Sequence, residues 1–288
     1  MIRRILPLFA CLLAAAVIRF WLAPLAARLT ANYTSETHYL QVNQFRDSPD
    51  GEWQSSELTV RRIDQALAVK DQAIMIQGDL HIYYDNGALN FETSGLYGVD
   101  RRSRENLPGY GNEKRAGQYL FPAPAAKTKY TLRDPFYIGP QTITFDHTEK
   151  VDGLSVYVFT LSVVELNETD GYGYLPIVPE QYLAHTNARG TIWVEPLSGV
   201  VVNYEDEGTS TFVDPASGEQ IADFNKWTNV FTPATRTAQT ALVRSACLRI
   251  LALETWLPGG LLLAGLGWLG MGYLRSSKLR DPEDGGAT

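Results

Sequence analysis

The sequence predicts a mainly β protein, an antiparallel sheet of sandwich-like or partial-barrel-like form in an external domain, with transmembrane helices at both ends of the chain. Three observations predict this class. Both ends contain apolar runs of membrane-spanning length. The middle alternates apolar and polar residues with a period of two, and no long helical pattern interrupts its strands. The average composition, 45% hydrophobic and 20% charged, hides this division because it combines two environments.

The N-terminal segment, residues 1–28, is interpreted as a signal-anchor or transmembrane helix. About 23 mostly apolar residues follow two arginines, with Arg19 as the one interruption, and about 20 such residues span a bilayer. As an anchor, the helix would let Arg19 extend to the outer interface. Small residues near Ala27 also suit a cleaved signal peptide, so that alternative stays open. A soluble helix is the third reading, although Ile5 to Ile18 is apolar on every side.

The body, residues 29–231, is expected to form the extracytoplasmic β domain. The pair Asn86-Gly87 between two apolar runs predicts a tight hairpin. Other runs have the β-branched, aromatic or alternating character of strands: Gln141–Phe145, Leu154–Leu161 and Val200–Tyr204.

Four further stretches of the body are interpreted from composition. Arg62–Lys70 has helical spacing and is a helical alternative within the sheet. Residues 103–117 and 167–188 are rich in Gly, Pro and charge and are predicted to be long loops. Glu205–Gly208 is predicted to be a solvated hairpin tip, with calcium binding as the alternative because Ca²⁺ prefers hard oxygen ligands.

A near-repeat predicts a three-stranded meander from Gly190 to Phe224. Val194–Gly199 recurs 19 residues later as Val213–Gly218. In each copy an acid precedes a proline, which sets φ for a turn, and a glycine supplies the positive φ that ends it. We therefore interpret Glu195 and Asp214 as turn residues rather than as a catalytic pair.

The C-terminal part is expected to contain a stalk helix at residues 232–254, a transmembrane helix at 255–274 and a cytoplasmic tail at 275–288. Thr232 is the expected N-cap, and Pro233 suits the first helical position. The apolar stripe of the stalk is expected at Leu242, Ala246, Arg249, Leu253 and Trp256. A small-residue face on which the two spans could pack is expected at Gly260, Ala264, Gly267, Gly270 and Gly272.

Basic residues predict the orientation of the two spans. Lys and Arg flanking a span favour the cytoplasmic side, and they occur before the first span and after the second: Arg3, Arg4, Arg275, Lys278 and Arg280. Both termini are therefore expected in the cytoplasm, with the main domain outside the cell (plasma) membrane.

The charge of the body excludes one class of partner. Residues 29–256 carry 18 Lys and Arg against 29 Asp and Glu, a net charge of −11. Binding to nucleic acid needs clustered basic residues that contact phosphates. We therefore expect no nucleic-acid partner.

The sequence contains none of the common catalytic motifs. It lacks G-x-S-x-G, a phosphate-binding glycine loop, H-E-x-x-H and a dinucleotide fingerprint. Single histidines lie on or beside predicted strands, at His38, His81, His147 and His185. Cys11 and Cys247 both lie outside the body, which excludes a paired-cysteine zinc site there. We predict no catalytic residues, no cofactor-binding residues, no metal ligands and no enzyme activity.

Several segments in order resemble the porin-PorA-like family of actinobacterial envelope proteins: Gly95–Arg102, Arg115–Pro122 followed by Lys129-Tyr130, Val151–Phe159, and Trp193–Gly199. The resemblance covers roughly residues 90–275. It implies an envelope protein with two membrane anchors and an external domain, and it offers no catalytic residues. We do not transfer pore activity, because a membrane β-barrel needs repeated strands with an outward apolar face.

The sequence therefore predicts a non-catalytic, membrane-anchored cell-envelope protein whose external β domain binds or organises an envelope component. The partners expected are the membrane itself, an envelope lipid or polymer, and another membrane protein. The alternatives are a lipid carrier or bridge with an apolar tunnel, and a porin-like channel subunit.

Overall fold

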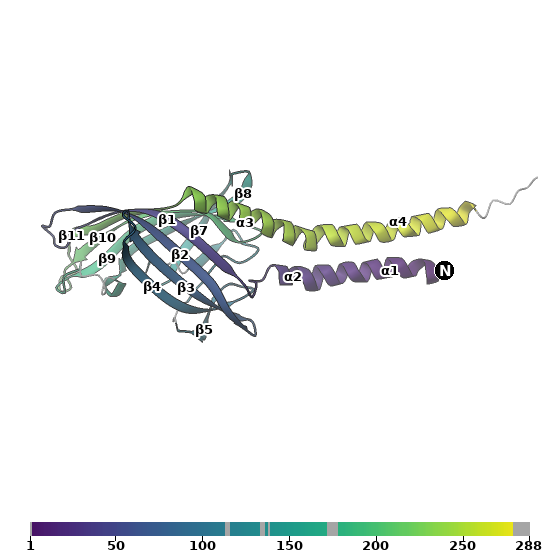
Figure 1. The fold of residues 1–288 in the computed structure, drawn as a ribbon, viewed down its shortest axis with the longest axis horizontal. Helices are drawn as coiled ribbons and strands as arrows, with labels where there is room; N and C mark the ends of the chain where they lie inside the picture. The colour runs from purple at the N-terminus through teal and green to yellow at the C-terminus, as the bar shows by residue number, and fades with distance from the viewer. Residues whose placement is uncertain (1, 113–115, 133–135, 138, 172–177, 279–288) are drawn as a thin grey trace, which may run out of the picture. The chain divides into compact units, whose positions relative to one another are not determined.

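The computed structural model describes residues 2–112, 116–132, 136–137, 139–171 and 178–278 (Figure 1). These residues form a large sheet and two long apolar helical segments, which confirms the predicted mainly β class. The strands are β1 (Thr34–Phe45), β2 (Gln54–Lys70), β3 (Ala73–Tyr84), β4 (Leu89–Asp100), β5 (Asn106–Gly111), β6 (Lys129–Leu132), β7 (Gln141–Val151), β8 (Leu154–Asn167), β9 (Leu183–Glu195), β10 (Val200–Val213) and β11 (Gln220–Phe231). The helical segments are α1 (Ile2–Val17), η1 (Ile18–Leu22), α2 (Ala23–Ala26), η2 (Thr169–Gly171), α3 (Pro233–Leu251), η3 (Ala252–Trp256) and α4 (Leu257–Lys278).

All of these strands belong to one antiparallel sheet, in the order β5-β4-β3-β2-β1-β11-β10-β9-β8-β7-β6. The first and last strands are neighbours in its centre, and the short strands β5 and β6 form its edges. Gln118 makes an antiparallel bridge to Glu105 and a parallel bridge to Leu132. The segment between the edge strands therefore pairs with both ends of the sheet, which is strongly curved (Figure 1).

Aromatic side chains form the main core on one face of the sheet. Tyr39 packs against Phe231 with ring centroids 4.9 Å apart, and Phe121 lies 4.9 Å from Phe159 by the same measure. All four rings are at most 5% exposed. Since Phe121 comes from the segment between β5 and β6, that segment both joins the edges and covers the core face.

The predicted hairpin and meander are confirmed. Gly87 has a φ of +81° between β3 and β4, and β9, β10 and β11 form consecutive antiparallel pairs. In each repeated turn the acid holds the backbone. The Glu195 carboxylate accepts hydrogen bonds from the Ser198 N–H (2.8 Å) and hydroxyl (2.6 Å), and Asp214 accepts the same pair from Ser217 (2.8 and 3.0 Å). The turn interpretation of both acids therefore agrees with their contacts.

The helical alternative at Arg62–Lys70 is wrong, because these residues continue β2 to its end. A register shift between Ala66 and Ala68 interrupts the pairing with β3. An extra residue in one strand breaks the period-two alternation locally, which is why the apolar residues there have a helix-like spacing.

The two predicted loops are partly strands. Residues 103–117 contain β5, and residues 167–188 contain the start of β9 at Leu183. β5 contains two glycines and a proline, so its composition resembled that of a loop, whereas the start of β9 was included because the predicted loop extended too far. Residues 113–115 and 172–177 of these stretches lie outside the described residues.

Helix α3 begins as predicted, but its buried side differs from the expected stripe. Thr232 accepts a hydrogen bond from the Thr235 N–H at 3.1 Å, which confirms the N-cap, and Pro233 is the first helical residue. The expected stripe included Leu242, which is 44% exposed, and Arg249, which is also exposed. The buried side chains at helical spacing are instead Thr235, Gln239, Val243 and Ile250. Two of these are polar, so hydropathy could not locate the stripe.

Among the described residues, two helical segments are long and apolar enough to cross a membrane, Leu6–Ala26 and Pro233–Met271. The chain divides into two compact units. One is Leu29–Arg244, which contains the whole sheet, and the other combines the N-terminal helix with the chain from Ser245 onward.

The pKa of Asp214 predicts a pH-dependent stability. The backbone N–H and hydroxyl of Ser217 lower this pKa from its ordinary value of 3.8. A carboxyl with a lowered folded-state pKa stabilises the folded chain above its unfolded pKa, and the contribution disappears as the pH falls through the folded pKa. Asp214→Ala should therefore lower the urea midpoint at neutral pH, and the difference from wild type should shrink below about pH 4. Asp85→Ala, in the β3–β4 hairpin, is the control. Equal pH profiles for the two variants would contradict the turn interaction.

Candidate functional site: a trough across five strands

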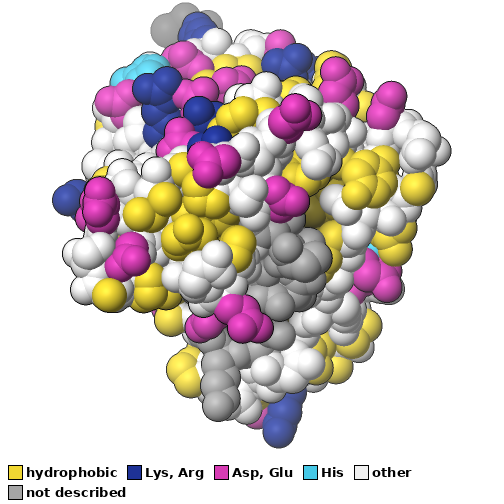
Figure 2. Space-filling model, turned by 90° about the vertical axis from the view of Figure 1, so that its left-hand side faces the viewer, with side chains coloured by type: hydrophobic (Ala, Val, Ile, Leu, Met, Phe, Trp, Pro, Cys, Tyr) yellow, Lys and Arg dark blue, Asp and Glu magenta, His cyan; other side chains and the backbone are white. Residues whose placement is uncertain are grey.

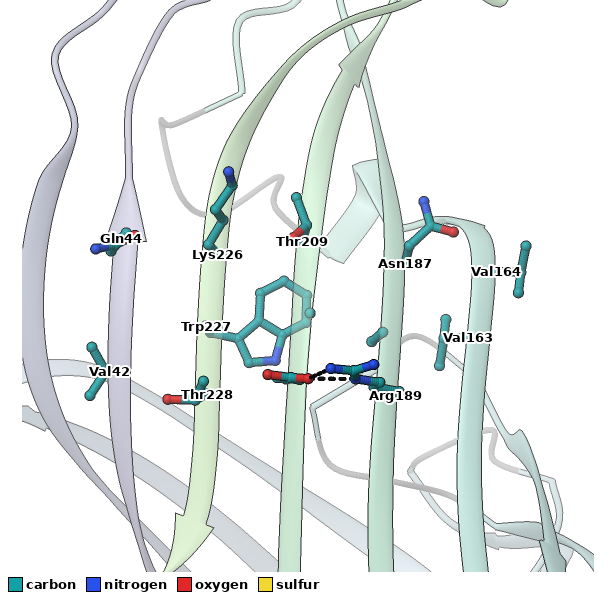
Figure 3. A pocket seen from close by; sticks show the side chains of 13 residues that line it. Val42, Gln44, Val163, Val164, Asn187, Arg189, Thr209, Lys226, Trp227 and Thr228 are labelled. Carbon is teal, nitrogen blue, oxygen red and sulfur yellow. Dashed lines mark hydrogen bonds and ion pairs between the residues drawn. The ribbon is translucent and has the colours of Figure 1, made fainter.

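The strand register aligns two rows of side chains on the face of the sheet opposite the aromatic core. Residues of neighbouring strands that pair in register point to the same side. One row consists of Gln44, Lys226, Thr209 and Asn187, and the other of Val42, Thr228, Glu207 and Arg189. All are exposed or half-buried. Figure 3 shows both rows crossing β1, β11, β10 and β9.

Between the rows lies a trough of about 680 Å³. Trp227, Gly208 and Ala188 form its floor with Val163 of β8, and these four residues pair in register with one another. The side chain of Trp227 lies in the core below, and a Cβ at position 208 would overlap its ring. Glycine at 208 therefore leaves the space that the indole of Trp227 occupies.

The walls of the trough combine opposite charges, amides, hydroxyls and apolar groups. Arg189 pairs with Glu207 across the strands, with side chains 83% and 47% exposed. Exposed pairs of this kind contribute little to stability, so a ligand could replace the contact at small cost. Val164, 73% exposed, and Val42, 46% exposed, add apolar surface at the two ends.

An exposed tryptophan lies beside one wall. Trp53, in the loop between β1 and β2, is 41% exposed. The guanidinium of Arg46 lies 4.9 Å from the centroid of its ring and the ammonium of Lys226 lies 5.1 Å from it. Asp223 holds both cations, accepting from Arg46 Nε through its carbonyl (2.6 Å) and pairing with Lys226 through its carboxylate (3.1 Å). Since Lys226 also lines the trough, the ring extends this surface.

Asp206 supports the trough from below. Its carboxylate is 5% exposed and accepts hydrogen bonds from Tyr137 Oη (2.6 Å), Asn229 Nδ2 (2.8 Å) and Trp227 Nε1 (3.1 Å). A buried carboxylate is tolerated when such donors satisfy it. The contact with Trp227 fixes the indole, and so fixes the floor.

The predicted hairpin tip at Glu205–Gly208 is wrong, because these residues lie within β10. Alternation along the strand directs Asp206 to the core and its two neighbouring glutamates to solvent. Three carboxylates on opposite faces cannot converge on one cation, so the calcium alternative fails for the same reason. Two of the three acids point to solvent, which explains why the run resembled a turn.

A second buried carboxylate, Asp64, has a comparable structural role. It accepts from Tyr119 Oη at 2.7 Å and from Arg62 Nε at 3.1 Å. Burial and the negative charge of Asp64 raise the pKa of Tyr119, which therefore stays protonated as a donor. The bond attaches the edge-joining segment to β2.

The remaining sequence candidates do not converge on a site. The four histidines lie on four different strands, β1, β3, β7 and β9. No group of three or more His, Cys, Asp or Glu among the described residues could hold a metal ion. Sequence reasoning missed the trough because its walls depend on pairings between distant strands. The one local signal was Gly208 inside a strand pattern, which marks a close approach.

The comparisons with known proteins identify one family. The family model described as Porin PorA matches residues 9–274. No curated protein matches the chain. Among solved structures, a DUF1329 family protein from Desulfovibrio piger aligns over 74% of this chain and 89% of its own length, at 10% identity and a TM-score of 0.20. That likeness is too low to support any argument.

The Asp206 network predicts a selective loss of stability. Asp206→Ala leaves three buried donors without their acceptor and should lower the free energy of unfolding by about 3 kcal/mol. Tryptophan emission should also change, because the Trp227 N–H loses its partner. Glu205→Ala, one residue away on the solvent face, should change stability by less than about 0.5 kcal/mol. Urea unfolding of the detergent-solubilised chain, followed by fluorescence, measures both, and similar losses for the two variants would contradict a supporting role for Asp206.

Proposed function

The chain belongs to the Porin PorA family, and we propose that it is a non-catalytic, membrane-anchored cell-envelope protein whose β domain binds an envelope component in the trough. The observation that carries the proposal is the trough itself: a hollow about 680 Å³ in volume on an otherwise ordinary sheet face, with a floor fixed from below. Binding sites are typically preformed hollows with a few well-placed polar groups.

The lining favours a hydroxyl-rich envelope polymer as the component. One wall carries the amides of Gln44 and Asn187 with Lys226 and Thr209, and the other carries Thr228, Glu207 and Arg189 beside the apolar Val42. The polar groups can donate and accept hydrogen bonds with sugar hydroxyls. Trp53, 41% exposed beside the wall, adds an aromatic ring that contacts the cations of Arg46 and Lys226. A trough that crosses five strands suits a chain-like ligand.

Membrane anchoring through two helices is part of the proposal. Both helical segments have the length and hydropathy for a span. The basic residues before the first and after the second support a cytoplasmic position for both termini, by the positive-inside rule. The domain would then face the envelope outside the plasma membrane, where a polymer ligand is available. The mix of acidic and apolar side chains on one face of the protein suits such a solvent-exposed domain (Figure 2).

The contacts of three buried acids support a binding rather than a catalytic role. Glu195, Asp206 and Asp64 are each at most 8% exposed. Each carboxylate is engaged by donors that hold a turn, the trough floor or the edge segment. A general acid or base must reach the substrate. These carboxylates are instead hydrogen-bonded to donors within the fold.

Two alternatives remain for the experiment to decide. A lipid carrier would need an apolar tunnel, whereas the described core face is packed with aromatic rings such as Phe121 and Phe159. A channel would agree with the name of the family. Strands that cross a membrane need an outward apolar band, whereas the trough walls carry Arg189, Glu207 and Lys226.

Polymer binding can be measured by co-sedimentation of the detergent-solubilised chain with insoluble cell-wall polysaccharide from the host. Trp53→Ala should weaken binding about tenfold, because a stacked aromatic anchor is lost. Thr209→Trp should weaken it as well, since the larger side chain fills the trough. Tyr84→Ala removes a similarly exposed ring, 43% against 41%, from outside the trough and should have no effect.

Three results would redirect the proposal. Equal binding by all variants would exclude the trough. Lipids that co-purify with the chain, detected by mass spectrometry and absent from Thr209→Trp, would favour the lipid carrier. Conductance steps in a planar bilayer would favour the channel.

A further inference from the structure

The N-terminal helix and the C-terminal helix pack against each other in antiparallel orientation within one compact unit. Leu8 and Cys11 of α1 contact Gly265 of α4, and Arg19 further along the first helix contacts Glu254. As the residue number increases along the first helix, the number of the contacting residue in the second helix decreases, so the two helices are antiparallel. Figure 1 shows the two segments side by side.

Gly265 makes the close approach possible. A Cβ at this position would lie 2.9 Å from Leu8 Cδ1 and 3.2 Å from Cys11 Cβ. Small residues allow membrane helices to pack closely. The expected small face is therefore misplaced: a Cβ at Gly260, Gly267 or Gly270 would meet nothing within 4 Å, and Ala264 is exposed. The surroundings of Gly272, the last member of that face, lie outside the described residues.

The second contact is an ion pair between two apolar segments. Arg19 Nη1 lies 3.7 Å from Glu254 Oε1. Each residue belongs to a π-helical turn, η1 in the first helix and η3 in the second. Single π-helical turns inside α-helices are rare and often mark functional positions. Charged residues in spans are expensive to insert and generally pair with one another, so the two charges compensate each other.

Two tryptophans indicate how deep in the membrane the Arg19–Glu254 ion pair lies. Trp21 and Trp256 lie two residues from Arg19 and Glu254, and they are 75% and 56% exposed. Tryptophan favours the interface between hydrocarbon and water. At that depth the exposed parts of the charged side chains, 47% for Arg19 and 33% for Glu254, can reach water or lipid headgroups.

We propose that Arg19 and Glu254 form a clamp that holds the N-terminal helix against the C-terminal helix, so that the first helix is retained in the mature protein as one half of a membrane hairpin. A cleaved signal peptide needs no partner, whereas α1 makes side-chain contacts from Leu8 to Arg19 that cleavage near Ala27 would remove. Ala15 and Ala23, 5% and 1% exposed, lie along the same stretch. The inference rests on the proposed membrane anchoring and not on ligand binding.

A disulfide tests the pairing directly, because the chain already supplies one thiol at the contact. In a full-length Cys247→Ser background with tags at both termini, Gly265→Cys places a second Cβ 3.2 Å from Cys11 Cβ, just below the roughly 3.5–4.5 Å that disulfides need. The other close atom, Leu8 Cδ1, is the end of a flexible side chain that can turn aside, so the helices can stay packed. Copper-phenanthroline treatment of isolated membranes should then protect both thiols from maleimide-polyethylene glycol until reductant is added. Leu263→Cys, on an exposed position of the same helix, should give no disulfide.

Charge reversal tests the clamp. Arg19→Glu and Glu254→Arg should each slow disulfide formation about fivefold, as expected for loss of an exposed ion pair, and the double variant should restore the rate. Loss of the N-terminal tag from the membrane-bound chain would show cleavage and overturn the inference, as would a retained tag without a disulfide. Disulfide formation unaffected by charge reversal would overturn the clamp. A chain found only in the soluble fraction would instead contradict the proposed anchoring.

Discussion

The two edges of the sheet impose the main constraint on this fold. Edge strands expose unpaired N–H and C=O groups that must be satisfied or protected. One segment of the chain serves both edges. Gln118 N donates to Thr131 O of β6 at 2.6 Å, and Gly117 O accepts from Asn106 N of β5 at 2.9 Å. Because the same segment sends Phe121 into the core, edge pairing and core covering are achieved together.

Arg104 connects this segment to a distant turn. Its Nη1 donates to Phe121 O at 2.8 Å and to Ser198 O at 3.0 Å. Gly199, which follows Ser198 with a φ of +68°, leaves no room for a Cβ against Phe121 O and Pro122 O. Its counterpart in the repeat, Gly218, has a φ of +72° and open space. The two turns share one local sequence, but only the first is also a tertiary contact.

Local chemistry allowed much of the fold to be predicted. The hairpin at Gly87, the repeated turns and the cap of α3 depend on residues within a few positions of one another, and their sequence carries that information. The β2 bulge and the trough depend on which strand lies alongside, often across a long stretch of chain. Pairing between strands that are distant in the sequence leaves no pattern among neighbouring residues. The contact at Gly265 was missed for the same reason, since every glycine in the span looks alike until its neighbour is known.

The proposed binding and the proposed anchoring involve different kinds of stabilisation. The trough floor depends on Asp206, whose donors come from β11 and from Tyr137. Its walls, by contrast, are exposed side chains such as Arg189 and Glu207 that stabilise the sheet little. Wall residues can therefore be substituted without loss of the fold. A substitution that disturbs the floor, by contrast, changes both the trough and the stability of the sheet. The contacts between the N-terminal and C-terminal helices at Gly265 and Arg19 belong to the other compact unit. A substitution in one wall should then alter ligand binding alone, which is the behaviour expected of a recognition surface carried on a scaffold with a separate anchor.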